Sequence, residues 1–195
     1  GFVFVTGVNK GGYKINPSGS IAPVVNNMSN GLVKIISPDG ANLIPSQRVQ
    51  YKQSFDEIMG VTRDYLDTEI YFPWYDSKST GMSGDWITIS NPNYSDANVD
   101  VYIKNVKKGT YTISAGKTVA PSYTGVCDGP VKVVCTNGLK IYASQRALYK
   151  QAFNEVVGIP KKLLSDTIYF PWYDQLSTGA QDYILVGNPN DTAAT

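Results

Sequence analysis

The chain has 195 residues, of which 17% are charged, and its formal net charge is +1, which excludes the clustered positive charge of a nucleic-acid-binding surface. It contains no histidine and only two cysteines, so most nucleophile–base pairs and nearly all zinc sites are excluded, and we predict no enzyme, no catalytic residue, no metal site and no cofactor. No apolar run approaches the roughly 20 residues that span a bilayer, and the abundance of Tyr, Gly and Pro is typical of a secreted, extracellular β protein.

The first fifty residues predict short strands joined by tight turns. Residues 2–6 and 13–15 have the apolar and aromatic pattern of strands. Asn30-Gly31 and Asp39-Gly40 bracket the apolar run 32–37, and both dipeptides are strong hairpin signals. We therefore expect an antiparallel meander in this part of the chain.

The next stretch leads to an aromatic strand. Residues 53–68 predict a linker with one helical turn, and the strand follows it at Tyr71-Phe72-Pro73-Trp74-Tyr75-Asp76. Residues 86–89 and 99–103 both alternate in polarity and are separated by a few polar residues. This spacing predicts that they pair with each other as a hairpin.

The six aromatic-strand residues return at 169–174, and this repetition organises the whole chain. Residues 1–76 align without a gap onto residues 99–174, an offset of 98 positions. The chain therefore contains two copies of one unit, each long enough for a modest core of its own.

About seven short strands per copy, without an amphipathic helix, predict an all-β antiparallel sandwich. Several segments together resemble an immunoglobulin-like β-sandwich repeat: Trp86 to Asn91-Pro92, strand 99–103, Gly109, 112–116, and 144–146 to Tyr149. Such repeats occur in tandem in secreted and cell-surface proteins of bacteria and archaea. The resemblance implies that fold and that location, and it transfers no catalytic residue.

The resemblance also implies that the copies are shifted in phase relative to the domains. One complete sandwich would span 69–149, with linkers at 53–68 and 150–167, the second half of a sandwich at 1–52 and the first half of another at 168–195. The fold class we expect is two antiparallel immunoglobulin-like sandwich repeats in tandem, in which the terminal halves complete a domain.

On the hairpin interpretation, each terminal half holds one strand that lacks its partner. These assembly strands are Phe2, Val3, Phe4 and Val5 at one end and Tyr183, Ile184, Leu185 and Val186 at the other. An open apolar edge invites another chain to pair with it. The halves can close within one molecule, close between molecules, or belong to a longer repeat array.

We favour closure between molecules, in which copies of the chain join head to tail by strand addition. The predicted function is an extracellular structural protein, the subunit of a filament or surface layer. This expectation loses its basis if residues 2–6 already pair within their own chain.

The alternative function is a carbohydrate-binding or adhesive cell-surface module. In the aromatic strand, Ile70, Phe72 and Trp74 are predicted to face the core, and Tyr71, Pro73 and Tyr75 to share the other face. A flat tyrosine surface suits the apolar faces of surface glycans. More often, tyrosines of this kind cover a contact between domains or subunits.

A few charged and aromatic residues recur in both copies, and we predict that they are structural. They are Arg48, Glu57, Trp74 and Asp76 in the first copy, and Arg146, Glu155, Trp172 and Asp174 in the second. An arginine between apolar strand residues with repeated acids nearby predicts a bidentate arginine–carboxylate pair that holds the linker on the sandwich. Use of Glu57 and Asp76 as a glycosidase acid–base pair is disfavoured, because neither lies in a recognisable motif.

Two kinds of covalent modification are also predicted. Cys127 and Cys135 are replaced together by Ser29 and Ser37 in the other copy, which favours a disulfide. A simple hairpin between them places Cys135 opposite residue 122, so the bond requires a sharper fold-back, and both states stay open. Asn-x-Ser/Thr sequons make Asn27, Asn93 and Asn190 candidate glycosylation sites, although Asn-rich turns also produce this pattern by chance.

Overall fold

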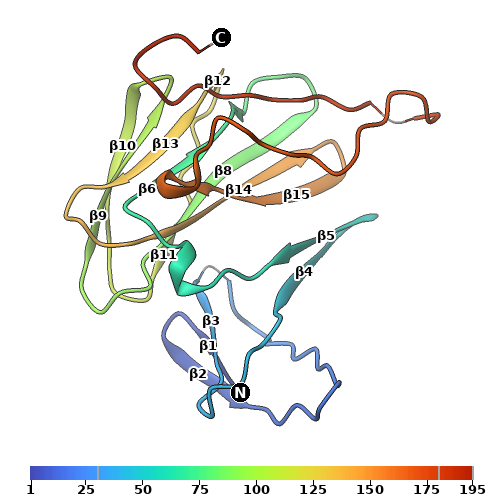
Figure 1. Ribbon diagram of the computed structural model, residues 1–195, viewed down its shortest axis with the longest axis vertical. Helices are drawn as coiled ribbons and strands as arrows, with labels where there is room; N and C mark the ends of the chain where they lie inside the picture. The colour runs from blue at the N-terminus through green and yellow to red at the C-terminus, as the bar shows by residue number, and fades with distance from the viewer. Residues whose placement is uncertain (30, 180, 195) are drawn as a thin grey trace.

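The computed structural model (Figure 1) describes residues 1–29, 31–179 and 181–194. The predicted all-β, antiparallel fold is confirmed: every strand pair is antiparallel, and the described residues contain no α-helix. Two short 3₁₀ turns, η1 (Arg63–Tyr65) and η2 (Lys161–Leu163), lie between the strands.

Two sheets packed face to face form the part of the molecule that we call the central sandwich. The first sheet has the order β10-β9-β13-β6-β16 and consists of β6 (Glu69–Phe72), β9 (Ala97–Ile103), β10 (Val106–Ile113), β13 (Val131–Cys135) and β16 (Ile159–Pro160). The second has the order β11-β8-β14-β15 and consists of β8 (Met82–Ser90), β11 (Thr118–Val119), β14 (Tyr142–Tyr149) and β15 (Ala152–Val157). A short pair, β7 (Tyr75–Asp76) with β12 (Cys127–Asp128), lies at the margin.

The core lies between these two sheets because alternate residues of each strand point inward. The first sheet contributes Ile70, Phe72, Val99, Val101, Ile103, Val131 and Val133, and the second contributes Ile87, Ile89 and Ala143. All are almost completely buried. Each large aliphatic or aromatic side chain buried in this way stabilises the fold by roughly 1.5–3 kcal/mol.

The predicted hairpin between residues 86–89 and 99–103 is wrong, because β8 and β9 belong to opposite sheets. Both strands bury their apolar residues, so the chain between them crosses from one side of the core to the other. The buried Asn91 holds this crossing: its Nδ2 donates hydrogen bonds to the carbonyls of Ser95 and Ile113, both at 2.8 Å.

Residues 2–59 form a smaller group of strands that we call the N-terminal module. Its first sheet, of order β2-β1-β3, contains β1 (Phe2–Val5), β2 (Val8–Gly12) and β3 (Val33–Ile36), and β4 (Ser46–Tyr51) pairs with β5 (Ser54–Met59) in a hairpin. The order and register are those of the equivalent strands of the central sandwich. Val5 lies opposite Val33, for example, as Ile103 lies opposite Val131.

The prediction that Phe2, Val3, Phe4 and Val5 form an open edge is wrong. Strand β1 is the middle strand of its sheet and pairs with β2 on one side and β3 on the other. Its equivalent in the central sandwich, β9, also lies between two strands of its own sheet, so β1 never required a partner from the other half. The original reason to expect polymerisation is therefore lost, and any assembly must use other edges.

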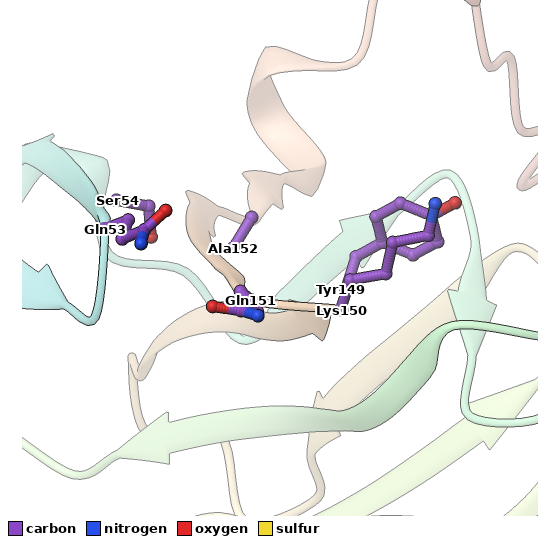
Figure 2. Close-up of a pocket in the computed structure, with 6 residues that line it drawn as sticks. All are labelled: Gln53, Ser54, Tyr149, Lys150, Gln151 and Ala152. Carbon is purple, nitrogen blue, oxygen red and sulfur yellow. The ribbon is translucent and has the colours of Figure 1, made fainter.

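The segments predicted as linkers also contain strands. Residues 53–68 include β5, and residues 150–167 include β15 and β16. The hairpins β4–β5 and β14–β15 lie side by side. Figure 2 shows the pocket between their turns, with Gln53 and Ser54 on one side and Gln151 and Ala152 on the other. Side chains of β5 accept hydrogen bonds from the open backbone edge of β15: Asp56 Oδ2 lies 2.9 Å from the Glu155 nitrogen.

Candidate assembly site

The N-terminal module has only part of the central sandwich's architecture. Strand β13 lies between β9 and β6, whereas its equivalent β3 pairs with β1 alone. Similarly, β14 lies between β8 and β15, whereas β4 pairs with β5 alone. Within the described residues, each of the two sheets of the module therefore ends at an open edge.

A cleft of about 1610 Å³ opens between these two edges and the central sandwich. Its apolar lining includes Val33, Ile35 and Leu43, each more than one-third exposed. Their equivalents at 131, 133 and 141 are fully buried core residues. The cleft is thus the interior of the module, left open where a second half of the core is missing.

The missing half has a counterpart in the C-terminal segment, residues 164–179 and 181–194, where no strand forms. The segment repeats β6, β7 and β8 in sequence. From Asp76 to Asp85 there are nine steps and from Asp174 to Asp182 eight, so the offset falls from 98 to 97 after this loop. Five core residues of the central sandwich, Ile70, Phe72, Tyr75, Ile87 and Ile89, have the exposed equivalents Ile168, Phe170, Tyr173, Ile184 and Val186.

The turns of the C-terminal segment already have the geometry of their equivalents. The Asp174 N–H donates to Asp182 Oδ2 at 2.5 Å, as the Asp76 N–H donates to Asp85 Oδ2 at 2.8 Å. The Asn190 N–H donates to an asparagine Oδ1 two residues earlier at 3.0 Å, the same distance as in the first copy. The segment therefore has the local turns of the equivalent sandwich strands, although its described residues form no strand.

The recurring arginines each contact a glutamate across a hairpin. In β4–β5, Arg48 donates from Nε to Glu57 Oε2 at 3.0 Å, and Ser46 Oγ donates to Oε1 at 2.6 Å. In β14–β15, Arg146 Nε lies 2.8 Å from Glu155 Oε2, and the serine two residues before Arg146 donates to Oε1 at 2.7 Å. The pair in the central sandwich is much more buried than the pair in the module. These residues join the two strands of each hairpin.

The remaining recurring residues serve turns and packing. Asp76 accepts hydrogen bonds from the N–H groups of Lys78 and Ser79, both at 2.9 Å, and Asp174 does the same in its own turn. Trp74 is half-buried and Trp172 is exposed. Glu57 and Asp76 belong to a hairpin of the module and to the margin of the central sandwich, so the structure does not bring this acid pair together in one site.

The predicted tyrosine platform is wrong for the first copy. Strand β6 ends at Phe72, the chain bends at Pro73, and β7 resumes at Tyr75, so the alternation of faces changes. Tyr75 is fully buried, and its hydroxyl donates to the Asp85 carbonyl at 2.8 Å. Tyr71 is also buried. Neither ring offers a face to a sugar.

Neither predicted modification is supported by a specific contact. Of the two states that the sequence left open for the cysteines, the structure has the free one: Cys127 is exposed beside β7, and the buried Cys135 ends β13. Cys135 belongs to the five-stranded sheet, so strand pairing separates the two thiols. Among the candidate glycosylation sites, Asn27 and Asn190 are exposed, while Asn93 Nδ2 donates to Asn91 Oδ1 and to the Lys140 carbonyl.

Sequence reasoning missed the open edges of β3 and β4. The 98-residue offset identifies these edges only when the neighbours of the equivalent strands β13 and β14 are known.

In the described ranges, no group of three or more acidic or cysteine side chains is placed to hold a metal ion. No described helix has the length and apolar character needed to cross a membrane. Comparisons of the chain with protein-family models, curated proteins and solved structures gave no match.

Proposed function

We propose that this chain is an extracellular structural subunit, built from immunoglobulin-like repeats, that joins head to tail with copies of itself into a filament or surface layer. One observation supports the proposal: the exposed apolar residues of the N-terminal module's cleft and those of the C-terminal segment are equivalent, by the repeat, to buried residues that pack together in the core of the central sandwich.

Burial of these exposed residues is the driving force. Ile168, Phe170 and Ile184 are each more than 60% exposed. Large apolar side chains contribute roughly 1.5–3 kcal/mol each when they leave water, so the union of the two halves is favoured. Contiguous exposed apolar surface on a folded protein marks an interaction site.

The positions of the two halves favour union between molecules. In Figure 1 the N-terminal module lies at the lower end and the C-terminal segment runs across the upper part, toward the chain end marked C. A contact that joins two different surfaces is head-to-tail, and it propagates unless its rotation closes a ring. This arrangement supports growth of a filament by one repeated contact.

The test is the molar mass of the full chain over a wide concentration range, measured by size exclusion with light scattering. We expect masses above the 21.3 kDa of one chain, rising with concentration. A double variant, Phe170→Asp with Ile184→Asp, should stay monomeric because charges cannot enter an apolar core. A wild-type chain that stays at 21.3 kDa throughout contradicts the proposal.

A further inference from the structure

We infer the register in which the halves of two copies join. Residues 167–170 of a second copy add to the open edge of β3, and residues 182–187 add to the open edge of β4, each in the register of the equivalent pair in the central sandwich. This inference rests on the proposed function and specifies its contact.

The edge of β3 has a direct template. Strand β13 pairs with β6 so that Val131 lies opposite Phe72, Lys132 opposite Tyr71 and Val133 opposite Ile70. At an offset of 98, Val33 lies opposite Phe170, Lys34 opposite Tyr169 and Ile35 opposite Ile168. This register turns the exposed Ile168 and Phe170 side chains into the cleft. A slip of one residue turns both side chains out to solvent.

The edge of β4 follows the same logic. Strand β14 pairs with β8 so that Ser144 lies opposite Thr88, Gln145 opposite Ile87 and Arg146 opposite Trp86. With offsets of 98 and 97, Ser46 lies opposite Leu185, Gln47 opposite Ile184 and Arg48 opposite Tyr183. Ile184 and Val186 then occupy the core positions of Ile87 and Ile89.

One polar contact fixes the register of residues 182–187 on β4. In the central sandwich Gln145 Nε2 donates to Asp85 Oδ2 at 2.8 Å, and both residues are buried. Their equivalents, Gln47 and Asp182, occur in the two separate halves. Asp182 Oδ2 already accepts the Asp174 N–H at 2.5 Å, as Asp85 Oδ2 accepts that of Asp76, so its carboxylate is set for the second donor. We expect Gln47 to supply it.

The cleft suits a chain segment of this kind better than a small ligand. Its volume of about 1610 Å³ exceeds the roughly 300–1,000 Å³ of small-molecule sites. It is also bordered by two strand edges with unpaired backbone groups, which a second polypeptide strand satisfies. A second copy supplies two such strands with matching side chains, connected by the loop after Asp174.

Disulfide trapping between two single-cysteine chains tests the register. Cys127 and Cys135 are first changed to Ser, the residues that the first copy has at these positions. Lys34→Cys and Tyr169→Cys are then placed in separate full-length chains, mixed and oxidised. Residues opposite each other in antiparallel strands are about 4.5–5.5 Å apart at Cα, within disulfide range. We expect the mixed disulfide dimer as the main product.

The matched control pairs Lys34→Cys with Thr167→Cys, two positions away on the same strand. Diagonal neighbours are about 7–8 Å apart, so the yield of mixed dimer should fall severalfold. Equal yields from Tyr169→Cys and Thr167→Cys overturn the register. A disulfide that forms only inside one chain carrying both Lys34→Cys and Tyr169→Cys overturns the second copy as occupant.

A variant of the polar contact gives an independent readout. Gln47→Ala should weaken self-association by about tenfold, because a buried carboxylate loses a hydrogen bond. Gln50→Ala, on the same strand, should leave association unchanged. Oligomers that form normally with Gln47→Ala, or without the Lys34–Tyr169 disulfide, contradict the register but leave the proposed function standing. A chain that never self-associates refutes both.

Discussion

Gln145 and Asp85 hold the second sheet of the central sandwich together from the inside. Gln145 Nε2 donates to Asp85 Oδ2 across the β14–β8 pair at 2.8 Å, and the two residues are 1% and 0% exposed. Asp85 Oδ1 has no hydrogen-bond partner in the described part of the chain. Burial raises the pKa of the Asp85 carboxyl to about 6. Because the pKa of Asp85 differs between the folded and unfolded states, the free energy of unfolding depends on pH.

Asp85→Asn should remove a pH dependence between about pH 4 and pH 6. The folded pKa of Asp85 lies above the ordinary 3.8, so the folded state binds more protons than the unfolded state in this window, and the free energy of unfolding falls as pH rises. Relative to wild type, the variant should gain up to about 3 kcal/mol between pH 4 and pH 7. Urea unfolding at several pH values measures this difference.

Asp100→Asn provides a control of opposite sign. Hydrogen bonds from Lys107 and Thr110 lower the pKa of the Asp100 carboxyl, so its contribution is present above its ordinary pKa and lost as pH falls through the folded value. This variant should therefore lose stability at neutral pH and approach wild type in acid. A flat pH difference for Asp85→Asn would show that Asp85 titrates normally.

Phe72→Ala and Phe170→Ala should differ strongly in effect, although the residues occupy equivalent positions. Phe72 is 2% exposed and Phe170 is 68% exposed. Removing the buried ring should cost about 3–5 kcal/mol, whereas Phe170→Ala should stay within about 0.5 kcal/mol in the dilute monomer. Thermal unfolding at low concentration measures both. An equally destabilising Phe170→Ala would mean that the segment packs within its own chain.

The repeated arginine–glutamate pairs should also differ with burial. Glu155→Gln leaves the partly buried Arg146 without its counter-ion and should cost about 2–3 kcal/mol. Glu57→Gln, in the exposed pair with Arg48, should cost much less, because solvent screens the pair. Equilibrium unfolding in urea compares the two, and equal costs would contradict the burial argument.

The two cysteines should react at different rates. Cys127 is exposed, whereas Cys135 is buried and burial raises the pKa of its thiol, which lowers its thiolate fraction. Iodoacetamide should label Cys127 in the native protein and Cys135 only after denaturation, as mass spectrometry of peptides can show. A native protein that takes no label until it is reduced would restore the disulfide.

Local sequence patterns predicted the class of fold but not the neighbours of each strand. Alternation identifies which residues of 86–89 and 99–103 face a core, and turn residues mark where strands end. Neither signal states in which sheet a strand lies. The buried amide of Asn91 holds the chain where it crosses from one sheet to the other. In the sequence, a single asparagine beside a proline is a weak signal for such a crossing.

The candidate site was partly accessible from sequence for a similar reason. The repeat showed that the two terminal parts of the sequence correspond to different parts of the repeated unit, because this depends only on counting residues. It placed the open edge on Phe2–Val5, because it assumed the wrong partner for that strand. The bend at Pro73 shifts the alternation by one position, because Phe72 and Tyr75 are three positions apart and both are buried, so Tyr75 faces the core and not the predicted tyrosine surface.

In the proposed assembly, the turns already formed in the C-terminal segment lower the conformational entropy that is lost when two copies join. Because Asp182 and Asn188 already close their loops, the conformational entropy lost on docking falls mainly on the short stretches between them. The C-terminal segment is partly folded before it docks, so each added copy orders few further residues. An array built this way grows at two chemically distinct tips, one offering the cleft and the other offering the preshaped segment.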